Sequence, residues 1–340
     1  MPLTRSIKYF NFVKEITKPL SPPKWATENR PVFELGNVIL RDFSSEGSTP
    51  DAPILIIPPQ AGHHSNIADY APGQSLVETC LSTKNSVYAT EWKSATPERK
   101  NETIDDCIRA MDRCIDAICK KGAKVRLIGL CQGGWQSAIY TALYPEKVHS
   151  LTLAAAPIDF KAGNGKIQFY ADFYPMMFYE CLVAAGGGNM PGECMKFGFK
   201  MLNPVDRFLL DYSDIYRSMN NQELYERQRA FRDWYEYTQN IPGAMYLQVV
   251  RELFKGNRLI KGALMILGRE VNLHKIKCPL ILIAGEKDDI TLKEQVFNME
   301  AYVSSKDILK KVVPAGHIGV FMSKKILKEY WPEFLRKSLG

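Results

Sequence analysis

Short apolar runs alternate with amphipathic helical patterns along most of the chain. Apolar runs bounded by turn residues predict buried strands. The expected strands are Val38–Phe43, Ile54–Ile57, Ser86–Trp92, Lys124–Ile128, Leu151–Ala155, Pro279–Ala284 and Ile308–Val313. The expected helices are Pro72–Thr83, Thr103 to Lys121 and Gly133–Leu143. This alternation predicts an α/β fold, with a mostly parallel sheet flanked by helices on both faces.

The clearest helical pattern is the one that begins at Thr103. Its apolar residues recur at spacings of three and four, at Ile104, Cys107, Ile108, Met111, Cys114, Ile115 and Ile118. Thr103 and Asp106 resemble a capping box, and Gly122 is a natural stop. Three cysteines lie within this pattern, where a free thiol acts as a small hydrophobic side chain.

The pattern changes near Asp159. From about 161 to 265 the sequence is helical and rich in aromatic residues, and it contains no convincing strand. We therefore expect residues 1–160 and 266–340 to form the two parts of an α/β core, and residues 161–265 to form a helical cap inserted between them. The aromatic residues of the cap either pack its helices together or line an acyl tunnel. They are Phe169, Tyr170, Phe173, Tyr174, Phe178, Tyr179, Phe231, Trp234, Tyr235 and Tyr237.

The sequence GLCQGG at residues 129–134 carries the strongest chemical signal. It contains G-x-C-x-G, the cysteine form of the nucleophile elbow, between a predicted strand and a predicted helix. The elbow requires small neighbours, which Gly129, Gly133 and Gly134 supply. Cys131 would then lie at a helix N-terminus, where the helix dipole favours a thiolate. We predict that Cys131 is a covalent nucleophile.

Two later residues complete a triad in the order of the α/β hydrolases. Asp288 follows the expected strand Pro279–Ala284, and His317 follows the expected strand Ile308–Val313. His317 would take the thiol proton and later protonate a leaving group, while Asp288 would orient His317 and stabilise its charged form. Asp159 and Asp289 are rival acids, and Cys131 could instead be a buried structural thiol.

Backbone N–H groups near the elbow are the expected oxyanion donors. The N–H of Gln132 is one candidate, and the backbone around Gln60 and Ala61, after the expected strand Ile54–Ile57, is the other. His63 follows in the same loop and is a possible pocket residue, although a loop histidine without a catalytic task is an equal alternative.

Composition narrows the class of protein only slightly. The chain has 340 residues, 46% of them hydrophobic and 24% charged, which is ordinary for a globular protein. The formal net charge is +7, and residues 301–340 hold eight Lys or Arg against three acidic residues. This basic end is either a solvated surface or an attraction for an anionic substrate or surface. No nucleic-acid motif accompanies it, so no nucleic-acid partner is expected.

The eight cysteines show no spacing typical of a metal site. The N-terminal residues lack the features of a signal peptide, and no apolar run is long enough to predict a transmembrane segment. We therefore expect free thiols in a reducing, cytoplasmic compartment, with no metal and no cofactor.

Several segments together resemble the superfamily of polyhydroxyalkanoate synthases and intracellular polyhydroxyalkanoate depolymerases, over nearly the whole chain. They are LIGLCQGG at 127–134, LYPEKV at 143–148, APIDF at 156–160, LIKG at 259–262, GREVNL at 268–273, and GHIG at 316–319 followed by Ser323. The resemblance in motifs and length is closest to the catalytic subunit of the short, two-component synthases. It implies a cysteine triad on an α/β-hydrolase core with a cap.

Other segments resemble different branches of the superfamily. The loop PQAGHHS at 59–65 lacks the Asn-Arg or Asn-Lys pair usual in synthases and is similar to the Gly-His of depolymerases. The sequence DDIT at 288–291 also resembles depolymerases. Trp135, after Gly134, is similar to large synthetase-like hydrolases and is a possible pocket residue.

The expected function is acyl transfer through a cysteine thioester, with polymerisation of 3-hydroxyacyl-CoA to polyhydroxyalkanoate and release of CoA. A thiolate exchanges readily with a thioester. Hydrolysis of a polyester or smaller ester by the same triad is the alternative, and a non-catalytic granule or scaffold protein is a third possibility. The resemblance implies an acyl-CoA or polyester substrate, a second synthase subunit or a homodimer as partner, and possible association with polymer granules.

Overall fold

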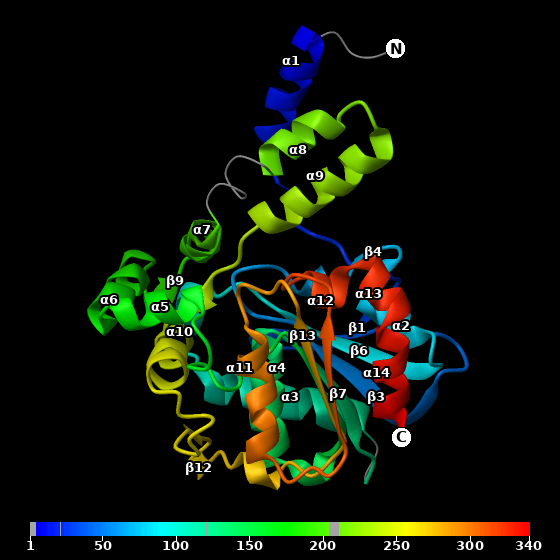
Figure 1. Cartoon of the computed structure of the whole chain (residues 1–340), viewed down its shortest axis with the longest axis vertical. Coiled ribbons are helices and arrows are strands. Elements are labelled where there is room, and N and C mark those ends of the chain that lie inside the picture. The colour runs from blue at the N-terminus through cyan, green and yellow to red at the C-terminus, as the bar shows by residue number, and fades with distance from the viewer. Residues whose placement is uncertain (1–4, 21, 120–121, 204–210) are drawn as a thin grey trace.

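The computed structural model describes residues 5–20, 22–119, 122–203 and 211–340, and its centre is a twisted sheet (Figure 1). Within the described residues this sheet has eight strands in the order β1-β2-β6-β3-β7-β8-β13-β14. The strands are β1 Arg30–Leu35, β2 Val38–Asp42, β3 Thr49–Ile57, β6 Asn85–Trp92, β7 Val125–Leu130, β8 Val148–Ala154, β13 Leu280–Gly285 and β14 Ile308–Val313. From β6 to β14 all neighbours are parallel, whereas β1, β2 and β6 pair antiparallel. The predicted α/β fold is confirmed.

Helices cover both faces of the sheet because successive strand residues point to opposite sides. On one face, Leu127 and Leu282 belong to a buried cluster with residues of α3 and α4. On the other face, Ile128 and Ile283 pack with residues of α2, α12, α13 and α14. The helices are α2 Leu76–Leu81, α3 Ile104–Ile118, α4 Gln132–Leu143, α11 Lys293–Phe297, α12 Gly319–Met322, α13 Lys324–Glu329 and α14 Trp331–Leu339.

A largely helical block lies between β8 and β13 in the sequence, and in Figure 1 it occupies the upper and left parts of the view. Its helices are α5 Lys166–Phe173, α6 Met176–Ala185, α7 Gly192–Leu202, α8 Asp211–Ser218, α9 Gln222–Glu236 and α10 Gly243–Gln248, followed by a π-helical turn Val249–Lys255. The N-terminal helix α1, Arg5–Ile16, contacts α8. The division into a core and a cap at residues 161 and 265 stays a prediction.

Several local predictions were wrong. The segment predicted as helix Pro72–Thr83 begins with the turn and second strand of a hairpin, formed by β4 Asp69–Ala71 and β5 Gln74–Ser75, and its helix α2 begins only at Leu76. Gly73 has a φ of +70°, which turns the chain there, and the Ser75 hydroxyl caps α2 by accepting from the Glu78 N–H.

The expectation of no strand between 161 and 265 was also wrong. β9 Asn189–Met190 pairs with β10 Ile241–Pro242, and β11 Met265–Ile266 pairs with β12 Arg269–Glu270. The sequence analysis missed β1, which has no period-two burial because nearly all its residues are exposed at the sheet edge. The predicted end of the helix at Lys121 lies outside the described residues.

Candidate active site

Cys131 lies in a sharp turn between β7 and α4. Its backbone has φ 49° and ψ −115°, a combination that is strained for a residue with a side chain. Its N–H donates to the carbonyl of Ala154 at the end of β8, at 2.9 Å, which ties the turn to the neighbouring strand. The side chain is half-buried. The predicted strand-turn-helix context of the G-x-C-x-G sequence is therefore present.

The three glycines around Cys131 are required by close contacts. A Cβ on Gly133 would lie 1.9 Å from the Ile57 carbonyl oxygen, and one on Gly129 would lie 2.5 Å from the Cα of Gly134. A Cβ on Gly134 would lie 2.1 Å from that of Ala156. Because real Cβ atoms do not approach other atoms this closely, only glycine lets α4 pack against β3, β7 and the segment after β8 at this turn.

His317 and Asp288 meet at the same edge of the sheet. The Nδ1 atom of His317, after β14, lies 2.9 Å and 3.1 Å from the two carboxylate oxygens of Asp288, after β13. Asp288 also accepts from the N–H groups of Ile290 at 2.9 Å and Thr291 at 2.8 Å. These two donors hold the carboxylate in place, and its side chain is fully buried.

The Cys131 side chain interacts with His317. Since Nδ1 is occupied by Asp288, Nε2 is the nitrogen left to face the sulfur. Burial alone lowers the pKa of His317, but the interactions with Asp288 and Cys131 outweigh it and raise the pKa well above its ordinary value. The protonated imidazole is therefore favoured, with the Asp288 carboxylate on one side and the Cys131 sulfur on the other.

The rival acids lie in other environments. Asp159 accepts from Asn257 at 2.7 Å and from Asn298 at 2.9 Å. Asp289 accepts a hydrogen bond from the side-chain amide of Asn203 at the end of α7. The structure thus brings Asp288, rather than either rival, to His317.

Cys131 and His317 open into a small, mostly apolar pocket of about 90 Å³. Core segments and two helices of the inserted block, α7 and α9, form its walls. Its lining residues are Pro59, Ala61, His63, Ile67, Cys131, Phe199, Leu202, Asn203, Trp234, Tyr235, Asp289, Ile290, His317, Ile318 and Phe321.

His63 is fixed in the wall of this pocket. Its Nε2 donates to the carbonyl of Tyr235 at 3.1 Å, and its ring stacks on that of Trp234 with centroids 5.0 Å apart. Burial lowers the pKa of His63 to about 4, so the ring is neutral at pH 7. A neutral, anchored His63 shapes the pocket and ties the loop after β3 to α9.

The predicted oxyanion and pocket residues differ in whether they lie at the pocket. Ala61 lines the pocket, and Gln132 begins α4, so its N–H belongs to the first turn and has no partner within the helix. The side chain of Gln60 is buried and accepts from the Cys107 thiol at 3.5 Å. Trp135, in the first turn of α4, is 2% exposed and packs in the core, and it is not among the residues that line this pocket.

The residues that α7 contributes to the pocket were not predicted from the sequence. Phe199, Leu202 and Asn203 reach the pocket from a helix more than 60 residues after the elbow, and no local pattern indicates this contact. For the aromatic residues of α9, the sequence left two roles open: packing of the cap helices or lining of an acyl tunnel. Trp234 and Tyr235 do both, because they stack on His63 and face the pocket.

Three further features concern metal ions, membranes and disulfides. Among the described residues, no group of three or more His, Cys, Asp or Glu side chains is placed to hold a metal ion. No helix in the described part of the chain is long and apolar enough to cross a membrane. All eight cysteines are free.

The profile of a family described as "Protein of unknown function (DUF3141)" matches residues 33–337. Relatives named "Poly(3-hydroxyalkanoate) polymerase subunit PhaC" include one from Haloferax mediterranei, 28% identical over 90% of this chain and 62% of its own length. Another, from Allochromatium vinosum, is 26% identical over 88% of this chain and 85% of its own length. The chain thus spans about three fifths of the Haloferax protein, and 60% of a similar one from Haloarcula marismortui.

Solved structures with the same fold are α/β hydrolases. A monoacylglycerol lipase from Paleococcus ferrophilus matches with a TM-score of 0.54 and 16% identity, covering 89% of this chain and 99% of the lipase. A hydrolase from Pseudomonas aeruginosa matches with a TM-score of 0.56 and 16% identity, covering 92% of this chain and 98% of that protein. The predicted α/β-hydrolase fold is therefore confirmed, as is the resemblance to polyhydroxyalkanoate polymerases.

Proposed function

The chain belongs to the family described as "Protein of unknown function (DUF3141)", and we propose that it is an acyltransferase that polymerises 3-hydroxyacyl-CoA through a thioester on Cys131. One observation carries the proposal. Cys131 and His317 line the same apolar pocket and interact with each other, and His317 contacts Asp288 through Nδ1. The polymerase names of the relatives support the choice of substrate class.

The proposed reaction has two acyl transfers. The Cys131 thiol gives its proton to Nε2 of His317, and Sγ attacks the thioester carbonyl carbon. The bond from that carbon to the CoA sulfur breaks, and the leaving thiolate takes the proton from His317. The hydroxyl of a growing chain then gives its proton to His317 and attacks the acyl carbonyl. Sγ leaves as a thiolate, and the polyester is longer by one unit.

The other residues support these steps. Asp288 holds His317 through Nδ1, so Nε2 faces the sulfur and the protonated ring is stabilised. The N–H groups of Gln132 and Ala61 are the proposed oxyanion donors, because Gln132 follows Cys131 at the start of α4 and Ala61 lines the same pocket as Cys131. Helices α5 to α10 are the proposed cap, since α7 and α9 cover the pocket and limit the entry of water.

Partners and location follow from the same proposal. The relatives are named as polymerase subunits, so a second subunit is a proposed partner, with a second copy of the chain as the alternative. A polyester product would place the protein at polymer granules in the cytoplasm. No bound cofactor takes part in the proposed steps.

The direct test is an assay with 3-hydroxybutyryl-CoA, with and without a candidate partner subunit. We expect free CoA and insoluble polyester in matched amounts, and neither with Cys131→Ala. Release of CoA with only monomeric hydroxy acid would contradict polymerisation.

Hydrolysis by the same residues is the second candidate, and the loop that carries His63 favours it. This Gly62–His63 segment resembles the depolymerase branch, and His63 lines the pocket. If the protein is a depolymerase, a suspension of amorphous polyester should clear and release hydroxy acid, and Cys131→Ala should stop the clearing. An unchanged suspension alongside polymer formation would remove this candidate.

A further inference from the structure

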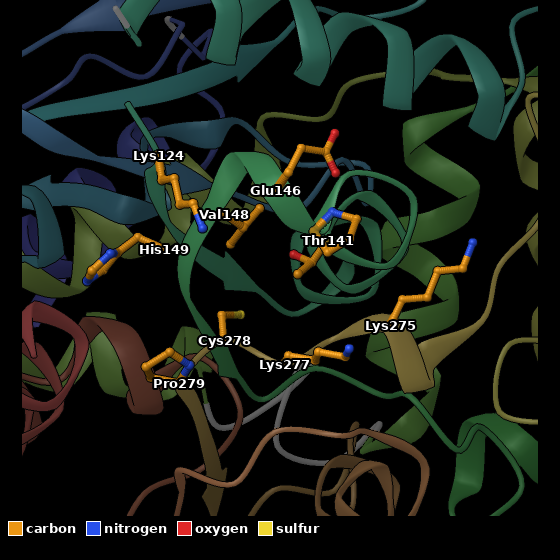
Figure 2. Close-up of a pocket in the computed structure, with 10 residues that line it drawn as sticks. Lys124, Thr141, Glu146, Val148, His149, Lys275, Lys277, Cys278 and Pro279 are labelled. Atoms are coloured by element: carbon orange, nitrogen blue, oxygen red, sulfur yellow. The ribbon is translucent and has the colours of Figure 1, made fainter. Parts of the chain in front are cut away.

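A second cavity lies at the opposite edge of the sheet from Cys131. It has a volume of about 510 Å³, and its lining residues come from the starts of β7, β8 and β13 and from the end of α4 (Figure 2). They are Lys124, Thr141, Pro145, Glu146, Val148, His149, Lys275, Lys277, Cys278 and Pro279. Cavities of this size hold small organic molecules in other proteins.

The side-chain amines of three lysines in this cavity lack internal partners. Those of Lys124, Lys275 and Lys277 form no ion pair or hydrogen bond with any residue that the structure describes. The neighbouring Lys147 differs, because it lies 2.7 Å from both Asp112 and Asp116. Local carboxylates therefore neutralise Lys147 and leave the three cavity lysines available to an external anion.

The cavity offers both charge and apolar surface. Figure 2 shows Val148 and Cys278 between the side chains of Lys124 and Lys277. Pro145 and Pro279 add further apolar wall. Glu146 is the one carboxylate among the lining residues, and in this view it is directed away from the amine of Lys277.

His149 indicates that the field in the cavity is positive. Its pKa is lowered by burial first and then by the charges of Arg126 and Lys124. Burial raises the pKa of the Cys278 thiol to about 11, and the nearby charge of Lys124 opposes that shift. At pH 7 both groups are therefore neutral, and the cavity charge comes from the lysines.

This cavity is separate from the pocket at Cys131. The six residues of β7, Val125–Leu130, lie between Lys124 at one edge and Cys131 at the other, a span of about 20 Å at about 3.3 Å per residue. The packed layers of the sheet and α4 fill the space between them. One ligand does not reach both through the core.

We propose that this cavity is a second binding site, for a phosphate-bearing organic anion of nucleotide size. Lysine is a point charge suited to phosphate, and the proline and valine walls suit a flat apolar body. A carboxylate ligand is less suited, because no arginine fork lines the cavity. The guanidinium of Arg126, whose charge acts on His149, already donates to the carbonyls of Ala52 and Ser338.

The test uses ADP as the probe and isothermal titration of the full chain. We expect ADP to bind wild type and to bind the Lys124→Ala/Lys277→Ala double variant at least about tenfold more weakly, because two of the three lysine charges that line the cavity are gone. Binding to wild type should also weaken as salt is raised. Lys325→Ala, an exposed lysine on α13, is the matched control and should bind ADP like wild type.

Further measurements show where ADP binds and which parts of the molecule are recognised. Acetylation of Lys124 and Lys277, read by mass spectrometry, should slow when ADP is present, and that of Lys325 should not. Adenosine should bind far more weakly than ADP. Pyrophosphate binding as tightly as ADP would overturn the role of the apolar wall. Equal ADP affinity in wild type and double variant, or no ADP binding to wild type, would overturn the site itself.

These outcomes are independent of the proposed acyl transfer. Thiol labelling of Cys131 by an acyl probe reports on the first pocket and should be the same in wild type and the double variant. Preferential binding of an acidic peptide over ADP would instead identify the cavity as a protein-docking surface and contradict the proposal.

Discussion

Cys131, directly after β7, and Cys114, in the middle of α3, differ in burial, in backbone conformation and in the groups around the thiol. Cys131 is half-buried in a strained turn and interacts with His317. Cys114 in α3 is fully buried among apolar side chains, and burial raises its pKa to about 12. The reactivity of a cysteine thiol therefore depends on its backbone geometry and on a charged neighbour, and not on the residue type alone.

The largest expected difference is between the effects of removing the Cys131 thiol and removing the Cys114 thiol. Cys131→Ala should lower acyl transfer by at least about a thousandfold, because no other group replaces the nucleophile. Cys114→Ala should keep activity near the wild-type value and cost about 1 kcal/mol of unfolding free energy through a small cavity. Initial rates of CoA release and urea unfolding measure the two effects. Comparable activity losses in both variants would contradict the distinction.

The partners of Cys131 should matter nearly as much. His317→Ala and Asp288→Asn should each lower kcat by about a hundredfold or more, since one removes the base and the other its orienting charge. Asp159→Asn is the matched control and should have little effect, because Asp159 bonds to two asparagines instead. A larger loss with Asp159→Asn than with Asp288→Asn would reassign the acid.

The glycines of the elbow should show a smaller but clear effect on stability. Gly133→Ala places a Cβ against the Ile57 carbonyl and should cost more than about 3 kcal/mol of unfolding free energy. Gly198→Ala in α7 meets nothing within 4 Å and should instead stabilise by about 0.5–1 kcal/mol. Denaturant midpoints give both values. Equal shifts in the two variants would show that the turn is not tightly packed.

The pH dependence of thiol alkylation should give the smallest effect. A raised pKa means that His317 stays protonated to higher pH than an ordinary histidine, so its positive charge faces the Cys131 sulfur in mildly acidic solution. At about pH 6, His317→Ala should react with iodoacetamide more slowly than wild type, and the two rates should converge as the pH rises through the pKa of His317. Cys114 should stay unreactive throughout.

The same shift has a consequence for stability with a definite sign. Because the folded-state pKa of His317 is raised, the stabilising contribution of its protonated form is fully present below about pH 6.5 and is lost as the pH rises through the folded value. A difference between wild type and His317→Gln in melting temperature that grows with pH would contradict this sign.

Local patterns explain why the core of this account could be predicted from the sequence. Cys131 and its glycines lie within six residues, and the parallel strands before Asp288 and His317 bring those side chains to one edge. Such features depend on short segments and on the rule that parallel strands share an edge. The sequence therefore indicated the elbow and the order of the triad.

Contacts between distant segments explain what could not be predicted. Phe199 and Asn203 reach the pocket through the packing of α7, and Trp135 turns into the core because of the exact rotation of α4. In the second cavity Lys124 is about 150 residues from Lys275 and Lys277 in the sequence, and they come together only where β7, β8 and β13 begin. Composition showed a basic protein but did not show this concentration of unpaired charge.

The most direct measurement of the central claim is peptide mapping by mass spectrometry after brief incubation with 3-hydroxybutyryl-CoA. The account predicts a 3-hydroxybutyryl group on Cys131, sensitive to hydroxylamine and absent from Cys131→Ala. CoA release without any adduct on Cys131, or an adduct on another cysteine that persists in Cys131→Ala, would contradict it.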